Sequence, residues 1–226
     1  MVEWSIAAFR AAESVRSIVV ACPPGHVHEL GGHDLAVVDG GETRAASVSN
    51  ALEAVGTELV AIHDAARPLV TAALVEAVLA TFLADAEADG AIAATQVTDT
   101  IKRTAPSASG DPPSASAPPQ SGGPEGTSAP LPLLSPDSGA LVIGETIDRG
   151  RLWAAQTPQV FRVEALRRAL EVDPARAAAA TDEAMLLEAA GGRVLIHPAP
   201  PENVKVTTPF DLRVAELLLA ERSRVA

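Results

Sequence analysis

The chain has 226 residues, 47% of them hydrophobic, and a formal net charge of −12 at pH 7. This length suffices to bury a full core as one domain, and the acidic balance argues against a general nucleic-acid binder, because binding to a phosphate backbone depends on clustered cations. No apolar stretch approaches the roughly 20 residues that a membrane helix needs, and no basic region followed by an apolar segment marks a signal peptide.

Short apolar runs alternate with segments of helical spacing along most of the chain. Strands are predicted at 17–21, 35–38, 59–62, 90–95 and 193–196, and helices at 44–54, 71–84, 163–170, 182–190 and 211–221. Thr181 is the expected N-cap of the helix over 182–190, and Gly191-Gly192 its stop. Such alternation with brief links predicts an α/β fold, with a mainly parallel sheet covered by helices on both sides.

The composition changes abruptly between Thr104 and Gly139. Nine of the eighteen prolines lie there, together with Ser, Gly and Ala, and the segment has no Val, Ile or Phe. It offers too little apolar surface to offset its ordering entropy, so we predict a disordered insertion at 104–139.

The single cysteine and a group of three histidines bear on the compartment and on metal binding. Cys22 is the only cysteine, so no internal disulfide is possible and a reducing compartment fits; we expect a cytoplasmic protein. Three histidines, His26, His28 and His33, could hold zinc, but no fourth ligand is evident beside them.

The segment 63–68 reads HDAARP directly after the apolar run 59–62 and is a strong candidate for a binding site. Ligands of open α/β sheets bind at the carboxyl ends of the strands. There an aspartate can hold a metal and an arginine can grip phosphate. Taken alone, the segment leaves a structural alternative equally open, in which Asp64 caps the next helix and Arg67 is a surface charge.

Two further segments carry polar residues in suggestive patterns. Val37–Ser47 reads VVDGGETRAAS, in which the glycines let the backbone approach a ligand, and Arg44 and Ser47 fall on the first turn of a helix, whose amides favour anions. Glu202–Thr207 reads ENVKVT and contains Lys205, one of two lysines beside fifteen arginines. In such a chain a lysine hints at a position that needs a compact point charge.

In order and spacing these segments resemble the 2-C-methyl-D-erythritol 4-phosphate cytidylyltransferases of the non-mevalonate isoprenoid pathway. The resemblance runs from Trp4 to the C-terminus and rests on 40–44 with Ser47, HDAARP, 99–103, 148–149 with 152–153, 157–159, 181–184 and 203–207. It implies a Rossmann-like nucleotidyltransferase domain spanning 1–226, with a protruding β-arm at 99–149 that carries the insertion. It also implies a homodimer, in which Thr100 and Arg149 serve the active site of the neighbouring subunit.

The family's reaction is attack of the methylerythritol phosphate oxygen on the α-phosphorus of CTP, with Mg²⁺ neutralising the triphosphate. The resemblance implies two catalytic residues, Lys205 as the cation at the α-phosphate and Asp64, which is also the metal ligand. The residues that it implies at the cytidine nucleotide are Gly41, Glu42, Arg44, Ser47 and Ala65. Those that it implies at the sugar-alcohol phosphate are Arg67, Thr100, Arg149, Thr157 and Thr181.

Several of these residues also allow a structural role. Thr157 precedes Pro158 and could set a turn, Thr181 could only cap a helix, and Arg149 could pair with Asp148 in solvent. Two other functions also stay open. One is a ribitol 5-phosphate cytidylyltransferase of the same fold, whose segment tends to read HDAVRP, so Ala66 favours methylerythritol phosphate. The other is a non-catalytic dimeric protein that binds a nucleotide or sugar phosphate.

The chain departs from the family pattern at its beginning. Members of the family open with a strand and a glycine-rich loop of the type AAGxGxRxG, followed by Pro-Lys-Gln, which wrap the triphosphate. This chain opens at Met1–Ile6, which looks like the family's first helix. We expect that a start further upstream restores the strand and the loop; the alternative is that the protein has lost this grip.

Overall fold

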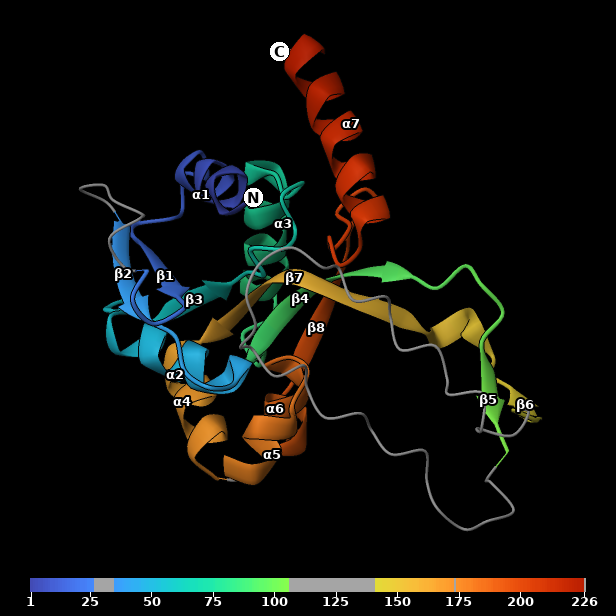
Figure 1. Ribbon diagram of the computed structural model, residues 1–226. Helices are drawn as coiled ribbons and strands as arrows, with labels where there is room; N and C mark the ends of the chain where they lie inside the picture. The colour runs from blue at the N-terminus through green and yellow to red at the C-terminus, as the bar shows by residue number, and fades with distance from the viewer. Residues whose placement is uncertain (27–34, 106–140, 173, 226) are drawn as a thin grey trace. The chain divides into compact units, whose positions relative to one another are not determined.

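A computed structural model describes residues 1–26, 35–105, 141–172 and 174–225. These residues form two compact units (Figure 1). The first, which we call the body, comprises Met1–Thr95 and Ala154–Ala226; the second, which we call the arm unit, comprises Gln96–Trp153. Apart from Thr104 and Ala105, the predicted insertion lies outside the described residues.

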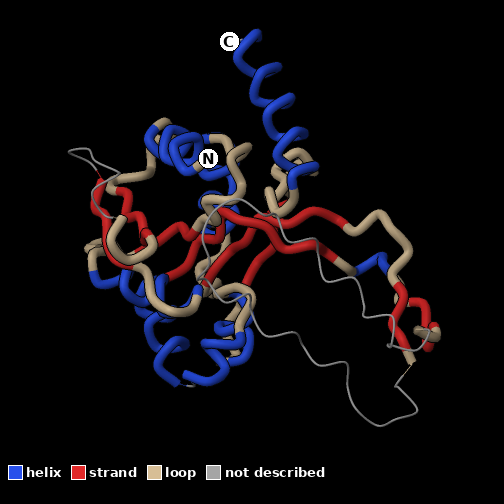
Figure 2. Tube along the Cα trace, viewed as in Figure 1, coloured by secondary structure: helices blue, strands red, loops and turns tan. Residues whose placement is uncertain are grey.

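The strands of the body form two sheets. They are β1 (Ile18–Cys22), β2 (Leu35–Asp39), β3 (Leu59–Ile62), β4 (Gly90–Gln96), β7 (Trp153–Arg162) and β8 (Val194–Pro198). β1 pairs with β2 in parallel, and the larger sheet has the order β3-β7-β4-β8, with β4 and β8 parallel (Figure 2). The predicted α/β class is confirmed. Because β7 runs antiparallel to β3, the sheet is mixed.

The helices agree with the predicted ones at most positions. They are α1 (Val2–Arg10), α2 (Arg44–Glu53), α3 (Ala72–Leu83), α4 (Val163–Val172), α5 (Pro174–Ala179), α6 (Ala184–Ala189) and α7 (Pro209–Val225). Two elements, α5 and β7, were not predicted. For β7 the reason is that its sequence, WAAQTPQVFR, lacks the alternation of a half-buried strand. In the described part of the chain, no helix is long and apolar enough to span a membrane.

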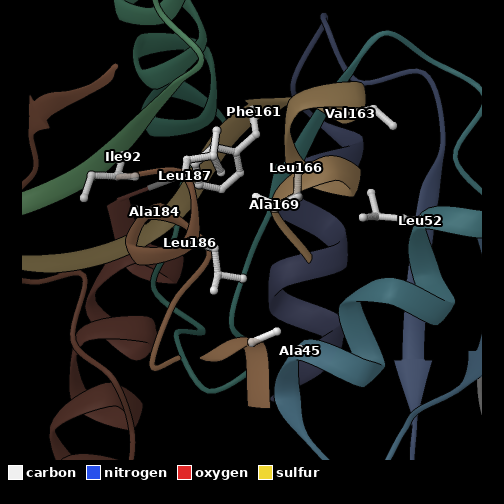
Figure 3. Packing of buried hydrophobic residues seen from close by; sticks show 11 residues of the cluster. Ala45, Leu52, Ile92, Phe161, Val163, Leu166, Ala169, Ala184, Leu186 and Leu187 are labelled. Carbon is white, nitrogen blue, oxygen red and sulfur yellow. The ribbon is translucent and has the colours of Figure 1, made fainter. Parts of the chain in front are cut away.

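Alternate residues of the central strands face two different helical layers. Ile92 of β4 and Phe161 of β7 pack into a core cluster with residues of α2, α4 and α6 (Figure 3). Their neighbours Ala91 and Val160 join a second cluster, which contains Phe82 of α3. Because side chains alternate across a strand, helices cover both faces of the sheet, as predicted.

The helix ends show one correct and one wrong prediction. Gly191 has a positive φ of 81°, a conformation that glycine adopts without strain, so the predicted stop after α6 is confirmed. Thr181 is not the N-cap of this helix, which begins at Ala184. Instead, a carboxylate oxygen of Asp182 accepts a hydrogen bond from the Met185 N–H at 3.0 Å, because Asp182 lies three residues before that exposed amide.

The strands β1 and β3 border an apolar cavity of about 860 Å³. It is lined by Ile18–Ala21 of β1 and Leu59–Ile62 of β3, and by side chains of α1, α2 and α3. Among the described residues β1 pairs only with β2, and β3 only with β7. Arg44, Asp64 and Lys205 also line this cavity, so the slot between the two sheets reaches the polar site described below.

The arm unit contains an antiparallel ribbon of β5 (Lys102–Thr104) and β6 (Ile143–Thr146), followed by a short 3-10 helix, η2 (Arg149–Arg151). This confirms that the sequences on either side of the insertion are β-like. Apolar residues of the ribbon face solvent in the single chain: Val142 is 66% exposed and Ile143 is 61% exposed.

Candidate active site

Four charged side chains from distant parts of the sequence meet at the carboxyl end of β3. Asp64 follows β3, Arg44 opens α2, Glu183 precedes α6, and Lys205 lies in the loop between β8 and α7. One oxygen of Asp64 lies 3.2 Å from Nη2 of Arg44, and the other lies 2.9 Å from Nζ of Lys205. Nη1 of Arg44 forms an ion pair with Oε1 of Glu183. The four residues therefore form one chain of alternating charge.

The surrounding cations keep Asp64 ionised. Burial acts to raise the pKa of this carboxyl, but the hydrogen bond from Lys205 and the charge of Arg44 outweigh it, and the pKa lies below its usual value. The Asp64 side chain is 16% exposed and that of Lys205 is 45% exposed. A ligand can therefore reach both the carboxylate and the ammonium group from solvent.

Arg44 and Glu183 lie deeper in the site. The Glu183 side chain is 1% exposed, and its second oxygen, Oε2, is buried without a hydrogen-bond partner among the described residues. Burial raises the pKa of Glu183, although the hydrogen bond and charge of Arg44 oppose this effect. For Arg44, the two carboxylates overcome the cost of burial, and the pKa of the guanidinium is raised.

A relay of hydrogen bonds holds the backbone at Asp64. The Asp64 N–H donates to Oγ1 of Thr157 at 3.1 Å, and Thr157 lies 2.9 Å from Nδ1 of His63. Nε2 of His63 lies 3.1 Å from the carbonyl oxygen of Arg67. Because that carbonyl can only accept, Nε2 carries the proton and Nδ1 accepts from Thr157. Burial, the largest cause, lowers the His63 pKa to about 4.

The segment that carries Lys205 is fixed to the HDAARP turn and to β7. The Val206 N–H donates to the carbonyl oxygen of Ala66 at 2.7 Å. The Asn203 side chain is 1% exposed and its Nδ2 donates to Gln156 Oε1 and to the Thr157 carbonyl, each at 2.9 Å. These bonds place Lys205 beside Asp64 from a loop that would otherwise be free to move.

The glycine segment before α2 packs tightly against the first turn of that helix. The Gly41 N–H donates to Oγ of Ser47 at 3.0 Å, and a Cβ at Gly41 would collide with Ala46. Thr43 caps the helix, its side chain accepting from the Ala46 N–H at 3.1 Å. A glycine at 41 is therefore needed for packing within the chain, and its predicted close approach to a ligand stays a prediction.

Residues 1–109 and 135–221 match the 2-C-methyl-D-erythritol 4-phosphate cytidylyltransferase family. The chain therefore belongs to this cytidylyltransferase family. The cytidylyltransferase of Aeromonas hydrophila is 34% identical over 99% of the chain and 79% of its own length. The bifunctional enzyme IspD/IspF of Anaeromyxobacter dehalogenans is 37% identical over 92% of the chain, which spans 47% of that relative.

The fold agrees with solved structures of the cytidylyltransferase family. The chain superimposes on the Thermus thermophilus 2-C-methyl-D-erythritol 4-phosphate cytidylyltransferase with a TM-score of 0.71 and 30% identity, covering 96% of this chain and 88% of the other. The predicted Rossmann-like nucleotidyltransferase fold is thus confirmed. The predicted roles of individual residues stay predictions.

The body brings together most of the residues predicted from the cytidylyltransferase pattern. Those that lie near the carboxyl ends of β2 and β3, or on β7 beside them, are Gly41, Glu42, Arg44, Ser47, Asp64, Ala65, Arg67 and Thr157. Gly41, Glu42 and Ala65 are exposed, whereas Thr157 is 3% exposed and bonded within the relay. Thr181 is exposed near the start of α6.

Arg67 has partners that the cytidylyltransferase resemblance did not imply. Its guanidinium is buried, with Nη1 donating to the Asn203 carbonyl at 2.8 Å and Nη2 to the Ala155 carbonyl at 3.4 Å. Burial lowers its pKa. Arg67 is therefore not a surface charge. In this arrangement its guanidinium is not free to bind phosphate, because it connects the HDAARP turn to two neighbouring segments through hydrogen bonds.

Thr100 and Arg149 belong to the arm unit. Both are exposed, and Nη1 of Arg149 donates to the Thr98 carbonyl oxygen. Asp148 accepts from the Gly150 N–H at 2.9 Å, so it caps the short helix η2, and no ion pair joins it to Arg149 among the contacts of the described residues. The role of either residue in a neighbouring subunit stays a prediction.

Glu183 and His63 are site residues to which the sequence patterns gave no role of their own. The signal for Glu183 was a carboxylate directly before the apolar run AMLL, where it must lie at the edge of the core. Of the three histidines considered for zinc, His28 and His33 lie outside the described residues. Within the described residues, no group of three or more His, Cys, Asp or Glu side chains could hold a metal ion.

Proposed function

We propose that this chain transfers a cytidylyl group from CTP to 2-C-methyl-D-erythritol 4-phosphate. A phosphate oxygen of the sugar alcohol attacks the α-phosphorus of CTP and forms a new P–O bond. The bond from the α-phosphorus to the bridging oxygen breaks, and pyrophosphate leaves. The products are 4-diphosphocytidyl-2-C-methyl-D-erythritol and pyrophosphate.

One observation carries this proposal: three of the segments shared with the family, 40–47, 63–68 and 203–207, converge on Asp64. Arg44 and Lys205 each bind one oxygen of its carboxylate. Nucleotidyl transfer asks a protein mainly for alignment and for cations near the phosphates. A cluster with two cations and an accessible carboxylate meets that need.

The chemistry of the donor set fits Mg²⁺ bound together with a triphosphate. Mg²⁺ is commonly held by one or two carboxylates plus phosphate oxygens rather than by an all-protein cage, and Asp64 offers one such carboxylate beside two phosphate-binding cations. Asp64 would hold the ion, which neutralises the triphosphate when bound. Lys205 stabilises the negative charge that grows at the α-phosphate.

In this proposal, the nucleotide lies against the segment 40–47, which leads into α2. Gly41 and Ala65 have no side chain beyond a methyl group to block a base or ribose, and Glu42 and Ser47 offer hydrogen-bonding groups. The sugar-alcohol phosphate is held, in this proposal, by Thr181. Thr157, whose hydroxyl proton goes to His63, acts on this subsite by fixing the backbone at Asp64, and Arg67 fixes the turn beside it. The phosphate monoester needs no general base, because it is already ionised near neutral pH.

We also propose that the protein is a homodimer joined through the arm unit. Exposed apolar residues of the arm unit support this, namely Ile101, Leu141, Val142, Ile143 and Trp153, which are 36–66% exposed. Clustered exposed apolar residues mark an interaction surface. In the dimer, Thr100 and Arg149 would complete the active site of the neighbouring subunit. The cytoplasmic location expected from the sequence stays part of this proposal.

The deciding experiment measures pyrophosphate release by the chain supplied with CTP, Mg²⁺ and 2-C-methyl-D-erythritol 4-phosphate, with ribitol 5-phosphate in a parallel reaction. Release with the methylerythritol substrate alone is the expected result. Release with ribitol 5-phosphate alone would overturn the substrate assignment. Binding of CTP by calorimetry without release from either substrate would instead identify the non-catalytic binding protein.

A further inference from the structure

We propose that Glu183 is a positioning residue that divides the Arg44 guanidinium between two carboxylates and so keeps Asp64 available to a metal-bound nucleotide. The proposal rests on the proposed function for its kinetic consequence. Its structural part concerns the contacts of Arg44 alone. Glu183 touches no predicted substrate position, since its side chain is 1% exposed.

The two ends of the Arg44 guanidinium have different partners. Nη1 binds Glu183, whereas Nη2 lies 3.2 Å and Nε 3.4 Å from the same oxygen of Asp64. Two parallel N–H···O bonds from one arginine to both oxygens of one carboxylate make the strongest such pair. Here Nε and Nη2 both reach a single Asp64 oxygen, Lys205 takes the second oxygen, and Glu183 holds Nη1, so Arg44 does not pair with both oxygens of Asp64.

The charges of the cluster explain why this division matters. Glu183 and Asp64 carry two negative charges, and Arg44 and Lys205 carry two positive ones, so the cluster is neutral before a ligand arrives. To hold a divalent ion, Asp64 would give up part of its contact with Arg44 and Lys205, and these two cations would then be free for phosphate oxygens. If Arg44 bound both oxygens of Asp64, this exchange would cost more.

Burial makes Glu183 suited to hold Arg44 throughout the exchange. An ion pair removed from water is screened less than an exposed one, and Glu183 stands directly before α6, whose residues Leu186 and Leu187 are 3% and 2% exposed. Its position is therefore set by the core. Arg44 stays anchored at Glu183 while its other end passes from Asp64 to a phosphate.

The test compares Glu183→Gln, which keeps a hydrogen-bond acceptor and removes the charge, with Glu188→Gln, an exposed change on the same helix. In a crystal structure of Glu183→Gln, the contact of Arg44 Nη1 with residue 183 should lengthen or be lost, and Arg44 should contact both oxygens of Asp64. In steady-state assays the Mg²⁺ concentration for half-maximal turnover should rise about tenfold, which is the size expected when one charge-assisted contact is lost. The value of kcat at saturating Mg²⁺ should change less than about threefold. Glu188→Gln should change neither quantity.

An unmoved Arg44 in the Glu183→Gln crystal, or an unchanged Mg²⁺ requirement, would overturn the proposal. An equal fall of kcat at all Mg²⁺ concentrations would also overturn it, since that pattern indicates a general loss of structure. If the unaltered protein shows no cytidylyl transfer, the proposed function fails. The crystal structure then still decides whether Glu183 divides Arg44.

Discussion

The body buries polar side chains and bonds them to one another, whereas the arm unit exposes apolar ones. Gln159, Glu183 and Asn203 of the body are each 1% exposed. In the arm unit, Val142 and Ile143 are more than half exposed, and the ion pair between Arg103 and Glu145 lies in solvent with side-chain exposures of 66% and 53%. The body thus places polar side chains beside its apolar core, whereas the arm unit leaves apolar side chains in solvent.

The difference separates a part of the protein that is already organised from one that a partner would cover in the proposed homodimer. A buried polar group costs free energy unless it is hydrogen-bonded, so the body's polar network fixes the site before any ligand binds. Covering exposed apolar surface instead lowers the free energy of the protein in water. We infer that the body carries a preformed site and that the arm unit serves assembly.

The largest expected effect is on turnover, and it distinguishes the lysine of the body from the lysine of the arm unit. Lys205→Ala should lower turnover by about 10² or more with the fold intact, because it removes an electrostatic stabiliser of the transition state. Lys102→Ala, which removes an exposed hydrogen bond to Thr146, should change turnover less than about twofold. Steady-state kinetics and circular dichroism check both variants. Equal turnover in the unaltered protein and Lys205→Ala would remove Lys205 from the mechanism.

The next effect concerns the pH dependence of stability in the body. Because the His63 pKa falls from 6.5 unfolded to about 4 in the folded protein, the unfolded chain binds the extra proton between these values. The contribution of His63 to the free energy of unfolding is therefore fully present above pH 6.5. It is lost as the pH falls toward 4, by about 2–3 kcal/mol for this group. Asp64, whose lowered pKa adds a loss only at lower pH, and Arg67 are the charged neighbours that act on His63.

Denaturant unfolding at pH 7.5 and pH 4.5 measures this change. The variant His63→Gln, which cannot titrate, should lose most of the difference between the two pH values. A difference of the same size in His63→Gln would show that other groups dominate acid destabilisation, and the relay through Thr157 would then have no part in it.

A smaller effect is expected from the buried amide of Asn203. Asn203→Ala removes its bonds to Gln156 and Thr157 and should lower the free energy of unfolding by about 2 kcal/mol, because a buried acceptor loses its partner. The matched change Asn50→Ala removes one exposed bond to the Asp39 carbonyl and should cost less than about 1 kcal/mol. Similar losses in both variants would contradict the contrast between buried and exposed polar groups.

The smallest effect belongs to the arm unit. Glu145→Gln breaks the exposed ion pair with Arg103 and should change the free energy of unfolding by less than about 0.5 kcal/mol, an effect that salt screens. Unfolding at low and high ionic strength checks this. A loss above about 1.5 kcal/mol would mean that the pair is shielded from water in solution, and the two units would then differ less than their exposures indicate.

Local patterns predicted much of the fold. The strand at 59–62 was predicted with its observed bounds, and the helices over 44–54 and 71–84 agree with α2 and α3 to within a residue at each end. These elements have clear apolar periodicity, which the sequence displays within a few residues. β7 escaped prediction because its pairing with β3 on one side and β4 on the other stabilises it, whereas its own residues do not alternate.

The sequence by itself determined the order of elements, the family and the segments that carry the polar residues, since each depends on neighbours along the chain. Only the tertiary structure decided which charges pair. Arg44 meets Glu183 across 139 residues, Asp64 meets Thr157 across 93, and Arg67 turns inward to Asn203 across 136. Such partners are chosen by the packing of the sheets and by the cost of leaving buried polar groups unpaired, and neither is visible in local spacing.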